Sequence, residues 1–195
     1  KGETGGVYQA KCKKTGEHFT IRRFYSNDGI YREGWELEFI KIVQQLSKVR
    51  HPNVSPILKA SLDPDGAYVI TKYQPPICNL IELCIDDIEP AVFNAFVENA
   101  LGALQALHDA EIVHGRLNLD SFLVCKSEQE KTQFILKDYG LRRIAPMIQG
   151  LDPQAKLPSD PVFLSPEHFK TGSLDDQTDL YMFGQMCYVL LAGFH

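Results

Sequence analysis

The chain has 195 residues, of which 44% are apolar and 23% are charged, and its formal net charge at pH 7 is −5. This length can bury one substantial core or build two small lobes around a cleft, and the balance is that of an ordinary globular domain. The acidic charge argues against a nucleic-acid or membrane partner, because both surfaces require concentrated positive charge.

The five cysteines are scattered and form no C-x-x-C pair. They indicate reduced thiols and a cytoplasmic location, and they support neither a disulfide framework nor a zinc site. The longest apolar run, within residues 181–194, is interrupted by Gly184 and Gln185 and is too short to span a bilayer.

The first 73 residues predict a small strand-rich unit with one helix. Apolar runs bounded by turn residues indicate four strands, at residues 7–10, 19–24, 54–62 and 67–73. A helix is predicted over residues 35–50, ending before the "HP" at 51–52. Its apolar residues recur at every third position: Leu37, Ile40, Val43, Leu46 and Val49.

The character of the sequence changes after "QPP" at residues 74–76, which we interpret as a hinge. A long helix is predicted over 90–110, with one apolar face: Val92, Phe96, Ala100, Leu104 and Leu107. Two short strands, an irregular Pro-rich stretch and a final helix follow, at residues 122–125, 134–137, 145–166 and 179–191. The sequence thus predicts a single domain over 1–195, with an N-lobe at 1–73 and a partial C-lobe at 77–195.

Short motifs along essentially the whole chain resemble those of eukaryotic-type protein kinases. In chain order they are "GETGGV" at 2–7, "FTIR" at 19–22 in place of V-A-I-K, "HPNV" at 51–54, "TKYQ" at 71–74, "HGR" at 114–116 in place of H-R-D, "DYG" at 138–140 in place of D-F-G, "SPE" at 165–167 in place of A-P-E, and "DLYMFG" at 179–184. Each motif is weak alone, but their order and spacing together are specific. The resemblance implies an α+β, bilobal protein-kinase-like fold. Its N-lobe would be small and β-rich with one helix, its C-lobe larger and mainly helical, and the domain would be truncated at both ends.

By the same resemblance, six positions depart from the residues that phosphoryl transfer uses: Arg22 for the strand lysine, Ile42 for the helix glutamate, Gly115 and Arg116 for the Arg-Asp of the catalytic loop, Asn118 for the loop lysine, and Ser121 for the metal-binding asparagine. A general base contributes about 10² to 10⁴ in rate, and a guanidinium cannot accept a proton at neutral pH. The resemblance therefore predicts a pseudokinase, which is not an enzyme. Two alternatives stay open: a shifted helix could pair Glu36 or Glu38 with Arg22, and Asp120 could replace the base.

The resemblance also places nine residues around a nucleotide cleft: Gly2, Gly5, Val7, Thr20, Arg22, Thr71, Lys72, Gln74 and Leu123. Asp138 could hold one Mg²⁺ against a nucleotide, with Ser121 as a weak second ligand, or it could only cap the turn after the strand at 134–137. We therefore expect no required cofactor, and weak ATP binding, with or without Mg²⁺, stays open.

Arg116 has two interpretations of its own. Its guanidinium could form an ion pair with Asp138 or Asp120 and fill the phosphate site, or it could bind a phosphate directly. The resemblance further implies a hydrophobic column resting on Asp179, whose carboxylate would bond to the catalytic-loop backbone. The members of this column are Leu46, Ile57, His114 and Tyr139.

Together these features predict a catalytically inactive kinase-like domain that serves as a scaffold or allosteric regulator. Its partner would be a protein, either an active kinase or another domain of the same polypeptide, docking below the hinge or around residues 170–177. One alternative is a weakly active atypical serine/threonine kinase that uses Arg22, Asp120 and Asp138. Another is an ATP-binding sensor without phosphotransfer. We also expect the chain to be a fragment of a longer protein.

Overall fold

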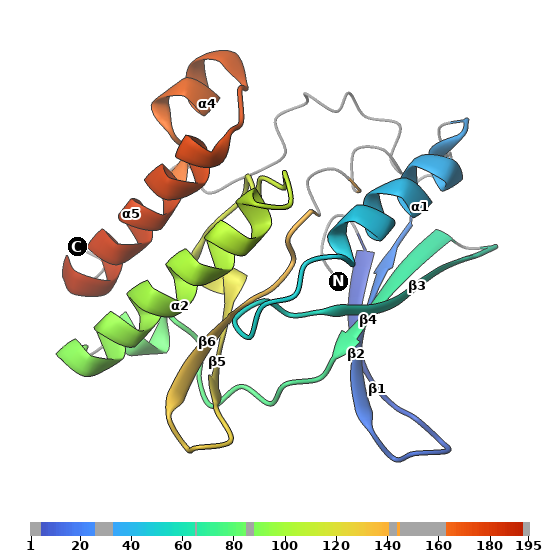
Figure 1. Cartoon of the computed structure of the whole chain (residues 1–195), viewed down its shortest axis with the longest axis horizontal. Helices are drawn as coiled ribbons and strands as arrows, with labels where there is room; N and C mark the ends of the chain where they lie inside the picture. The colour runs from blue at the N-terminus through green and yellow to red at the C-terminus, as the bar shows by residue number, and fades with distance from the viewer. Residues whose placement is uncertain are drawn as a thin grey trace.

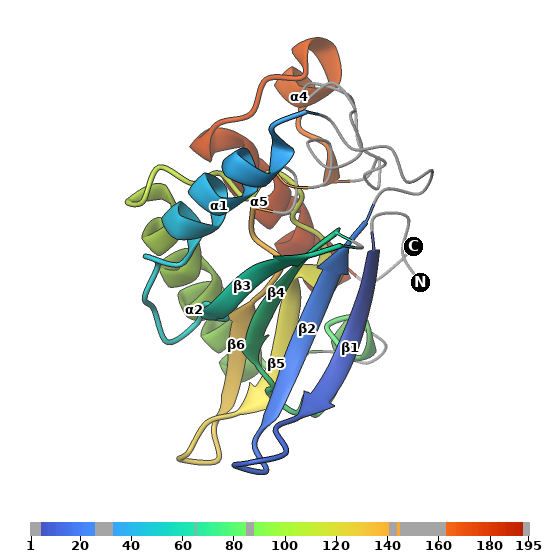
Figure 2. The ribbon, with the colours of Figure 1, turned by 90° about the vertical axis from the view of Figure 1, so that its right-hand side faces the viewer.

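The computed structural model describes residues 5–25, 33–64, 66–84, 88–140, 144 and 163–192, and its elements form two lobes (Figure 1). The first lobe is a four-stranded antiparallel sheet in the order β1-β2-β4-β3, seen face-on in Figure 2. Its strands are β1 (Gly5–Lys11), β2 (His18–Phe24), β3 (Ile57–Asp63) and β4 (Gly66–Lys72). All four lie within two or three residues of the predicted strands. The α+β, two-lobed fold is thereby confirmed.

One helix, α1 (Trp35–Leu46), covers this lobe, and two of the five apolar positions predicted for its buried side are exposed instead. Leu37 and Ile40 are 68% and 41% exposed. The reason is the helical period of 3.6 residues, because a repeat of three drifts around the helix axis whereas steps of three and four alternate along one face. The buried residues follow that alternation: Trp35, Phe39, Val43 and Leu46.

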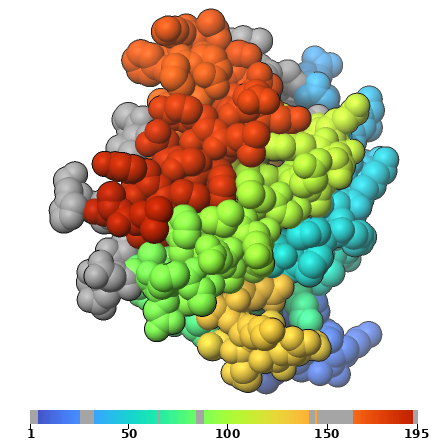
Figure 3. All heavy atoms as spheres, turned by 60° about the vertical axis from the view of Figure 1, so that its left-hand side comes forward, coloured from blue at the N-terminus to red at the C-terminus, as the bar shows by residue number. Residues whose placement is uncertain are grey.

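The second lobe combines helices with a β-hairpin. Its main elements are the 3₁₀ turn η1 (Glu82–Cys84), α2 (Pro90–His108), the 3₁₀ turn η2 (Leu119–Ser121), β5 (Phe122–Lys126), β6 (Thr132–Leu136), α4 (Pro166–Thr171) and α5 (Asp176–Ala192). Figure 3 shows α5, in red, lying against α2, in green, with the β5–β6 hairpin, in yellow, below α2. In the described part of the chain, no helix is long and apolar enough to cross a membrane.

Local capping explains two differences from the predicted C-lobe. Helix α5 begins three residues before the predicted start, because the Asp175 side chain accepts a hydrogen bond of 3.0 Å from the Thr178 N–H. Helix α4 was not predicted; its first turn is capped by the Ser165 hydroxyl, and Gly172 ends it with a positive φ of 74°. Most of the predicted irregular stretch, residues 145–162, lies outside the described residues.

Backbone hydrogen bonds join the lobes at two places. The chain before β3 runs beside β6, where Leu136 N donates to Asn53 O and Ser55 N donates to Leu136 O, both at 2.8 Å. The segment after β4 runs beside β5, where Ile77 N donates to Val124 O at 2.8 Å. These contacts set the β5–β6 hairpin beneath the sheet and so define the space between the lobes. The division at residues 74–76 stays a prediction.

Candidate functional site

A cavity of about 410 Å³ lies between the two lobes. Seven of the residues predicted for the nucleotide cleft line it: Val7, Thr20, Arg22, Thr71, Lys72, Gln74 and Leu123. Gly2 lies outside the described residues. Gly5 does not line the cavity. Its φ is 145°, and an added Cβ would sit 1.8 Å from the Arg23 carbonyl oxygen, so the pairing of β1 with β2 requires this glycine.

Several residues that line the cavity were not predicted from the sequence. One group consists of buried residues: Phe24, Leu46, Ser55, Ile57, Val69, Tyr139 and Ile144. Three of these had been assigned only to the hydrophobic column. Another missed residue is Lys137, whose position directly before Asp138 at the end of a predicted strand was the available signal. The cavity wall therefore combines buried, mostly apolar residues with the charged side chains of Arg22, Lys72, Lys137 and Asp138.

Arg22 forms an ion pair with Asp138 across the cavity. Both side chains are about one-quarter to one-third exposed, at 26% and 30%. This pairing corrects the prediction that Arg116 would pair with Asp138 or Asp120. Within the described residues the Arg116 guanidinium has no ion-pair partner, and Arg116 does not line the cavity. The reason is the register of β2, which places Arg22 opposite Val7 and Val69, two residues that also line the cavity.

The alternative of a shifted α1 is not realised. Glu36 and Glu38 are both exposed, and Ile42, at the position of the expected glutamate, is partly buried against the hydrophobic core. Because Asp138 takes the place of a helix carboxylate as the partner of Arg22, α1 makes no ionic contribution to this pair.

The polar residues of the catalytic-loop segment are used to cap η2. The Asn118 side chain accepts from Asp120 N at 3.0 Å, and the Ser121 hydroxyl accepts from Asn118 N at the same distance. This reciprocal arrangement is a capping box. Neither Asn118 nor Ser121 lines the cavity, and Asp120 is exposed and also lies outside it. The structure therefore gives no support to Asp120 as a general base.

The donor set does not fit a Mg²⁺ ion held by the protein. Asp138 is the cavity's single carboxylate among the described residues, and Arg22 already neutralises it. The Ser121 hydroxyl, predicted as a second ligand, is 5% exposed and bonded to Asn118. No cluster of three or more His, Cys, Asp or Glu side chains suited to a metal occurs in the described ranges. Mg²⁺ prefers six oxygen ligands in near-octahedral geometry, and one occupied carboxylate supplies little of that shell.

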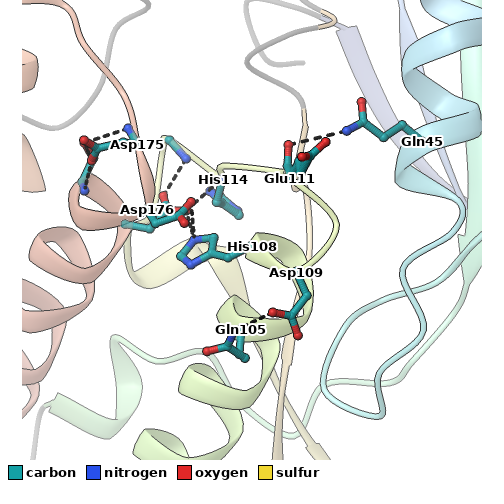
Figure 4. Close-up of polar contacts among 11 residues, drawn as sticks. Gln45, Gln105, His108, Asp109, Glu111, His114, Asp175 and Asp176 are labelled. Atoms are coloured by element: carbon teal, nitrogen blue, oxygen red, sulfur yellow. Dashed lines mark hydrogen bonds and ion pairs between the residues drawn. The ribbon is translucent and has the colours of Figure 1, made fainter.

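A fully buried carboxylate holds the catalytic-loop backbone in place. Asp179, at 0% exposure in α5, accepts hydrogen bonds from Gly115 N at 2.7 Å and from His114 N at 2.8 Å. His108, at the end of α2, contacts the same carboxylate through Nε2 at 2.9 Å. Figure 4 shows the His108 ring close to His114 and Asp176. The predicted role of Asp179 is confirmed. Gly115 adopts a positive φ of 69° at this bend, which a side chain would strain.

The predicted hydrophobic column is also buried. Its four members, Leu46, Ile57, His114 and Tyr139, are each exposed by 8% or less. The Tyr139 hydroxyl donates to Ser55 O at 3.1 Å, and burial raises the pKa of this phenol to about 12. Tyr139 thus stays neutral at physiological pH and fixes the backbone next to Asp138. Gly140 follows with a φ of +77°, and an added Cβ would lie 2.5 Å from Leu46.

A pH-dependent contribution to stability is expected from His108. Its hydrogen bond to Asp179 raises the pKa of the imidazole, although burial opposes the shift. A raised folded-state pKa means that the stabilisation is complete below the unfolded value, about 6.5, and is lost as the pH rises through the folded value. We therefore expect His108→Asn to lower the free energy of unfolding by about 1–2 kcal/mol at acidic pH and by less at alkaline pH. Urea denaturation of both proteins at about pH 5.5 and about pH 8.5 measures this.

The quantity to compare at the two pH values is the difference in the free energy of unfolding between variant and wild type. Burial lowers the pKa of His114 and of His51, and these two groups act in the opposite direction as the solution is acidified. A loss of equal size at both pH values would contradict the role of His108 as a proton-linked contact.

The fold and site together define a class of protein. A four-stranded sheet with one helix lies over a helical lobe, a cavity separates them, and a buried aspartate holds the loop beneath it. These are the features of a bilobal, protein-kinase-like domain. The family model of the protein kinase domain matches residues 1–195, and the chain therefore belongs to the protein kinase domain family.

Named relatives extend this likeness. The chain is 25% identical over 202 residues to the probable serine/threonine-protein kinase PBL24 of Arabidopsis thaliana, covering 99% of this chain and 50% of the relative. It is 24% identical over 199 residues to myosin light chain kinase A of Dictyostelium discoideum, covering 100% and 64%. The chain spans about half the length of the first of these relatives. Among solved structures, a crystal structure of Rad53 1–466 in complex with AMP-PNP matches with a TM-score of 0.76 at 18% identity. That match covers 100% of this chain and 46% of the other.

These relatives contradict the prediction that the domain is not an enzyme. Several that match 99% of the chain, PBL24 and PBL27 among them, are named serine/threonine-protein kinases. The prediction gave most weight to the missing base and metal ligand. Phosphoryl transfer depends mainly on positioning and on neutralising phosphate charge, and Arg22 retains a positive charge inside the cavity.

Proposed function

We propose that the chain is an atypical serine/threonine kinase domain that binds an adenine nucleotide between its lobes and transfers the terminal phosphoryl group slowly. The observation that carries this proposal is the cavity of about 410 Å³, which is lined both by the ion-paired Arg22 and Asp138 and by Gln74 and Pro76 of the predicted hinge. The kinase names of the relatives and the nucleotide analogue in the matched Rad53 structure support it.

The cavity wall suits a flat, partly apolar base. Val7 and Leu123 come from opposite lobes and would contact its two faces. Gln74 also lines the cavity, and its buried side-chain oxygen has no hydrogen-bond partner among the residues that the structure describes. A buried acceptor left unpaired costs about 1–3 kcal/mol, which a ligand donor such as the exocyclic amine of adenine would recover.

The cationic side chains of the cavity wall would bind the phosphates. Arg22 offers a guanidinium whose two N–H edges match phosphate oxygens. In the transfer step the serine or threonine oxygen attacks the terminal phosphorus, the bond to the bridging oxygen of the nucleotide diphosphate breaks, and the hydroxyl proton leaves to water. No cavity-lining residue among those described occupies the role of a positioned base, so we expect a rate about 10² to 10⁴ below that of a kinase with one.

Nucleotide binding and transfer are tested together with one substitution. At ATP concentrations a hundredfold above Kd, the free energy of unfolding should rise by about 2.7 kcal/mol, which is about 5–10 °C in melting temperature for a chain of this size. Arg22→Met should reduce this shift and lower radiolabelled phosphate transfer to a protein substrate at least about tenfold, because the phosphates lose their main cation.

Arg23→Met is the matched control. Arg23 follows Arg22 directly in β2, but its guanidinium contacts Asp63 at 2.8 Å and Arg23 does not line the cavity. This variant should transfer phosphate like the wild type. Absence of any ATP-induced shift in the wild type would overturn the proposed binding, and binding without transfer would leave a nucleotide sensor in place of a kinase.

We further propose a protein partner for the domain, either an active kinase or another domain of the same polypeptide, in the cytoplasm. The net charge of −5 supports a protein over a nucleic acid or a membrane. The region around residues 170–177 stays a candidate surface; it follows α4 and leads into α5, at the orange end of the molecule in Figure 3.

A further inference from the structure

We propose that the cleft binds its nucleotide without Mg²⁺, with Arg22 and Lys137 neutralising the phosphates and Asp138 opposing them as a competing partner of Arg22. This inference rests on the proposed function, because it assumes that a nucleotide occupies the cavity. In this proposal, side chains of the protein supply the positive charge that a divalent cation would otherwise bring. Asp138 competes with the phosphates for Arg22.

The charges that line the cavity carry the argument. In the part of the chain that the structure describes, three cationic side chains line it, those of Arg22, Lys72 and Lys137, against one carboxylate, that of Asp138. A site built to hold a metal ion shows the reverse balance, because divalent cations are bound by clustered carboxylates. An excess of fixed positive charge selects a polyanion that carries no cation of its own.

Lys137 is suited to this role by its surroundings. Its backbone is fixed, since its N–H donates to Ser121 O at 2.9 Å and its carbonyl oxygen contacts His114 Nε2 at 3.2 Å. The side chain is half-buried in the cavity wall, and no ion pair engages its ammonium group within the described ranges. The Lys137 ammonium group can therefore bind a phosphate directly, whereas Arg22 must first break its ion pair with Asp138.

The affinity for ATP depends both on the charge of the nucleotide and on the ion pair between Arg22 and Asp138. Free ATP carries about twice the negative charge of its Mg²⁺ complex at neutral pH, so it is attracted about twice as strongly by the same fixed cations. When its phosphates take Arg22, Asp138 is left as an uncompensated carboxylate next to them. Removing that carboxylate should therefore strengthen the binding of a polyanion and leave a neutral nucleoside unaffected.

Isothermal titration calorimetry on the chain tests this with ATP and adenosine as probes, each in excess EDTA and in excess Mg²⁺. We expect wild-type protein to bind ATP about three- to tenfold more tightly in EDTA than in Mg²⁺. Asp138→Asn should tighten ATP binding in EDTA about three- to tenfold, and asparagine tolerates the positive φ of 63° at this position. Lys137→Gln should weaken it by a similar factor.

Adenosine and a surface lysine supply the controls. Adenosine affinity should be the same in EDTA, in Mg²⁺ and in both variants. Lys126→Gln carries the same change on an exposed residue outside the cavity and should bind ATP like the wild type. Equal effects of Lys126→Gln and Lys137→Gln would overturn the role of Lys137.

The outcomes separate this inference from the proposed function. If Mg²⁺ tightens ATP binding tenfold or more and Asp138→Asn removes that gain, Asp138 is a metal ligand and the inference fails while nucleotide binding stands. If neither ATP nor adenosine binds under any condition, the proposed function itself fails.

Discussion

Replacing Asp179 by alanine is expected to lower the free energy of unfolding by about 3–5 kcal/mol. The carboxylate is completely buried and accepts three contacts, from two backbone N–H groups and one imidazole. Truncation leaves the N–H groups of His114 and Gly115 buried without an acceptor, and each costs about 1–3 kcal/mol. The loop that they belong to lies beneath the cavity, so its backbone should lose its fixed position before the rest of the C-lobe unfolds.

Thermal unfolding followed by circular dichroism measures the effect, and a fall of about 10 °C in melting temperature is expected for a chain of this length. Asp176→Ala is the matched control, because Asp176 is 57% exposed, lies in the same first turn of α5, and approaches His108 at only 3.8 Å. Its loss should cost less than about 1 kcal/mol. Similar melting temperatures for the two variants would show that the buried network contributes no more than a surface charge.

The parts of the site that the sequence predicted correctly are those whose partners are set by chain order. Val7, Thr71 and Leu123 each lie within a strand, in β1, β4 and β5. The strands were indicated by apolar runs bounded by turn residues, and the motifs that resemble protein kinases placed these residues at the cleft. The role of Asp179 was implied by the resemblance to protein kinases, and local chemistry agrees with it. A carboxylate that heads an apolar helix needs buried donors, and the bend at Gly115 supplies them.

The incorrect predictions for the site concern side chains that meet in the fold although they are far apart in the sequence. Arg22 and Asp138 are 116 residues apart, and nothing local distinguishes Arg22 from Arg116 as the partner of that carboxylate. The register of β2 beside β4 decides it, and register is fixed only when the sheet forms. The predictions for Asn118 and Ser121 were wrong for a different reason, because here local interactions decide. The two residues were assigned by family position, whereas their local chemistry is that of a capping box, which the sequence alone could have indicated.

The missing catalytic groups were given too much weight for a similar reason. The prediction that the domain is not an enzyme considered each catalytic position separately and depended on the absence of a base and of a metal ligand. The folded chain gathers Arg22, Lys72 and Lys137 from three separate segments around one cavity. Their combined charge appears only when the hairpin, the hinge and the sheet are in place, and it is this combined charge that could neutralise phosphates.

Replacing Phe96 by alanine is expected to cost about 3–5 kcal/mol, because the residue is completely buried where four elements of the C-lobe meet. Its ring, on α2, meets Phe122 of β5 edge-on at 5.4 Å and Phe134 of β6 at 5.2 Å, and it lies 5.8 Å from Phe183 of α5. Edge-to-face pairs add about 0.5–1.5 kcal/mol to area burial. Chemical denaturation with linear extrapolation measures the loss.

Leu101→Ala supplies the control, since Leu101 lies on the same helix but is 40% exposed, and its truncation should cost less than about 1.5 kcal/mol. Phe96→Leu, which keeps much of the volume, should fall between the two and keeps the test informative if the alanine variant does not fold. A cost for Phe96→Ala no greater than that of Leu101→Ala would contradict a single aromatic core. Phe96 also supports the hairpin that leads to Lys137 and Asp138. The folded fraction of Phe96→Leu should therefore bind ATP with nearly wild-type affinity, because the ring supports the site without touching the ligand.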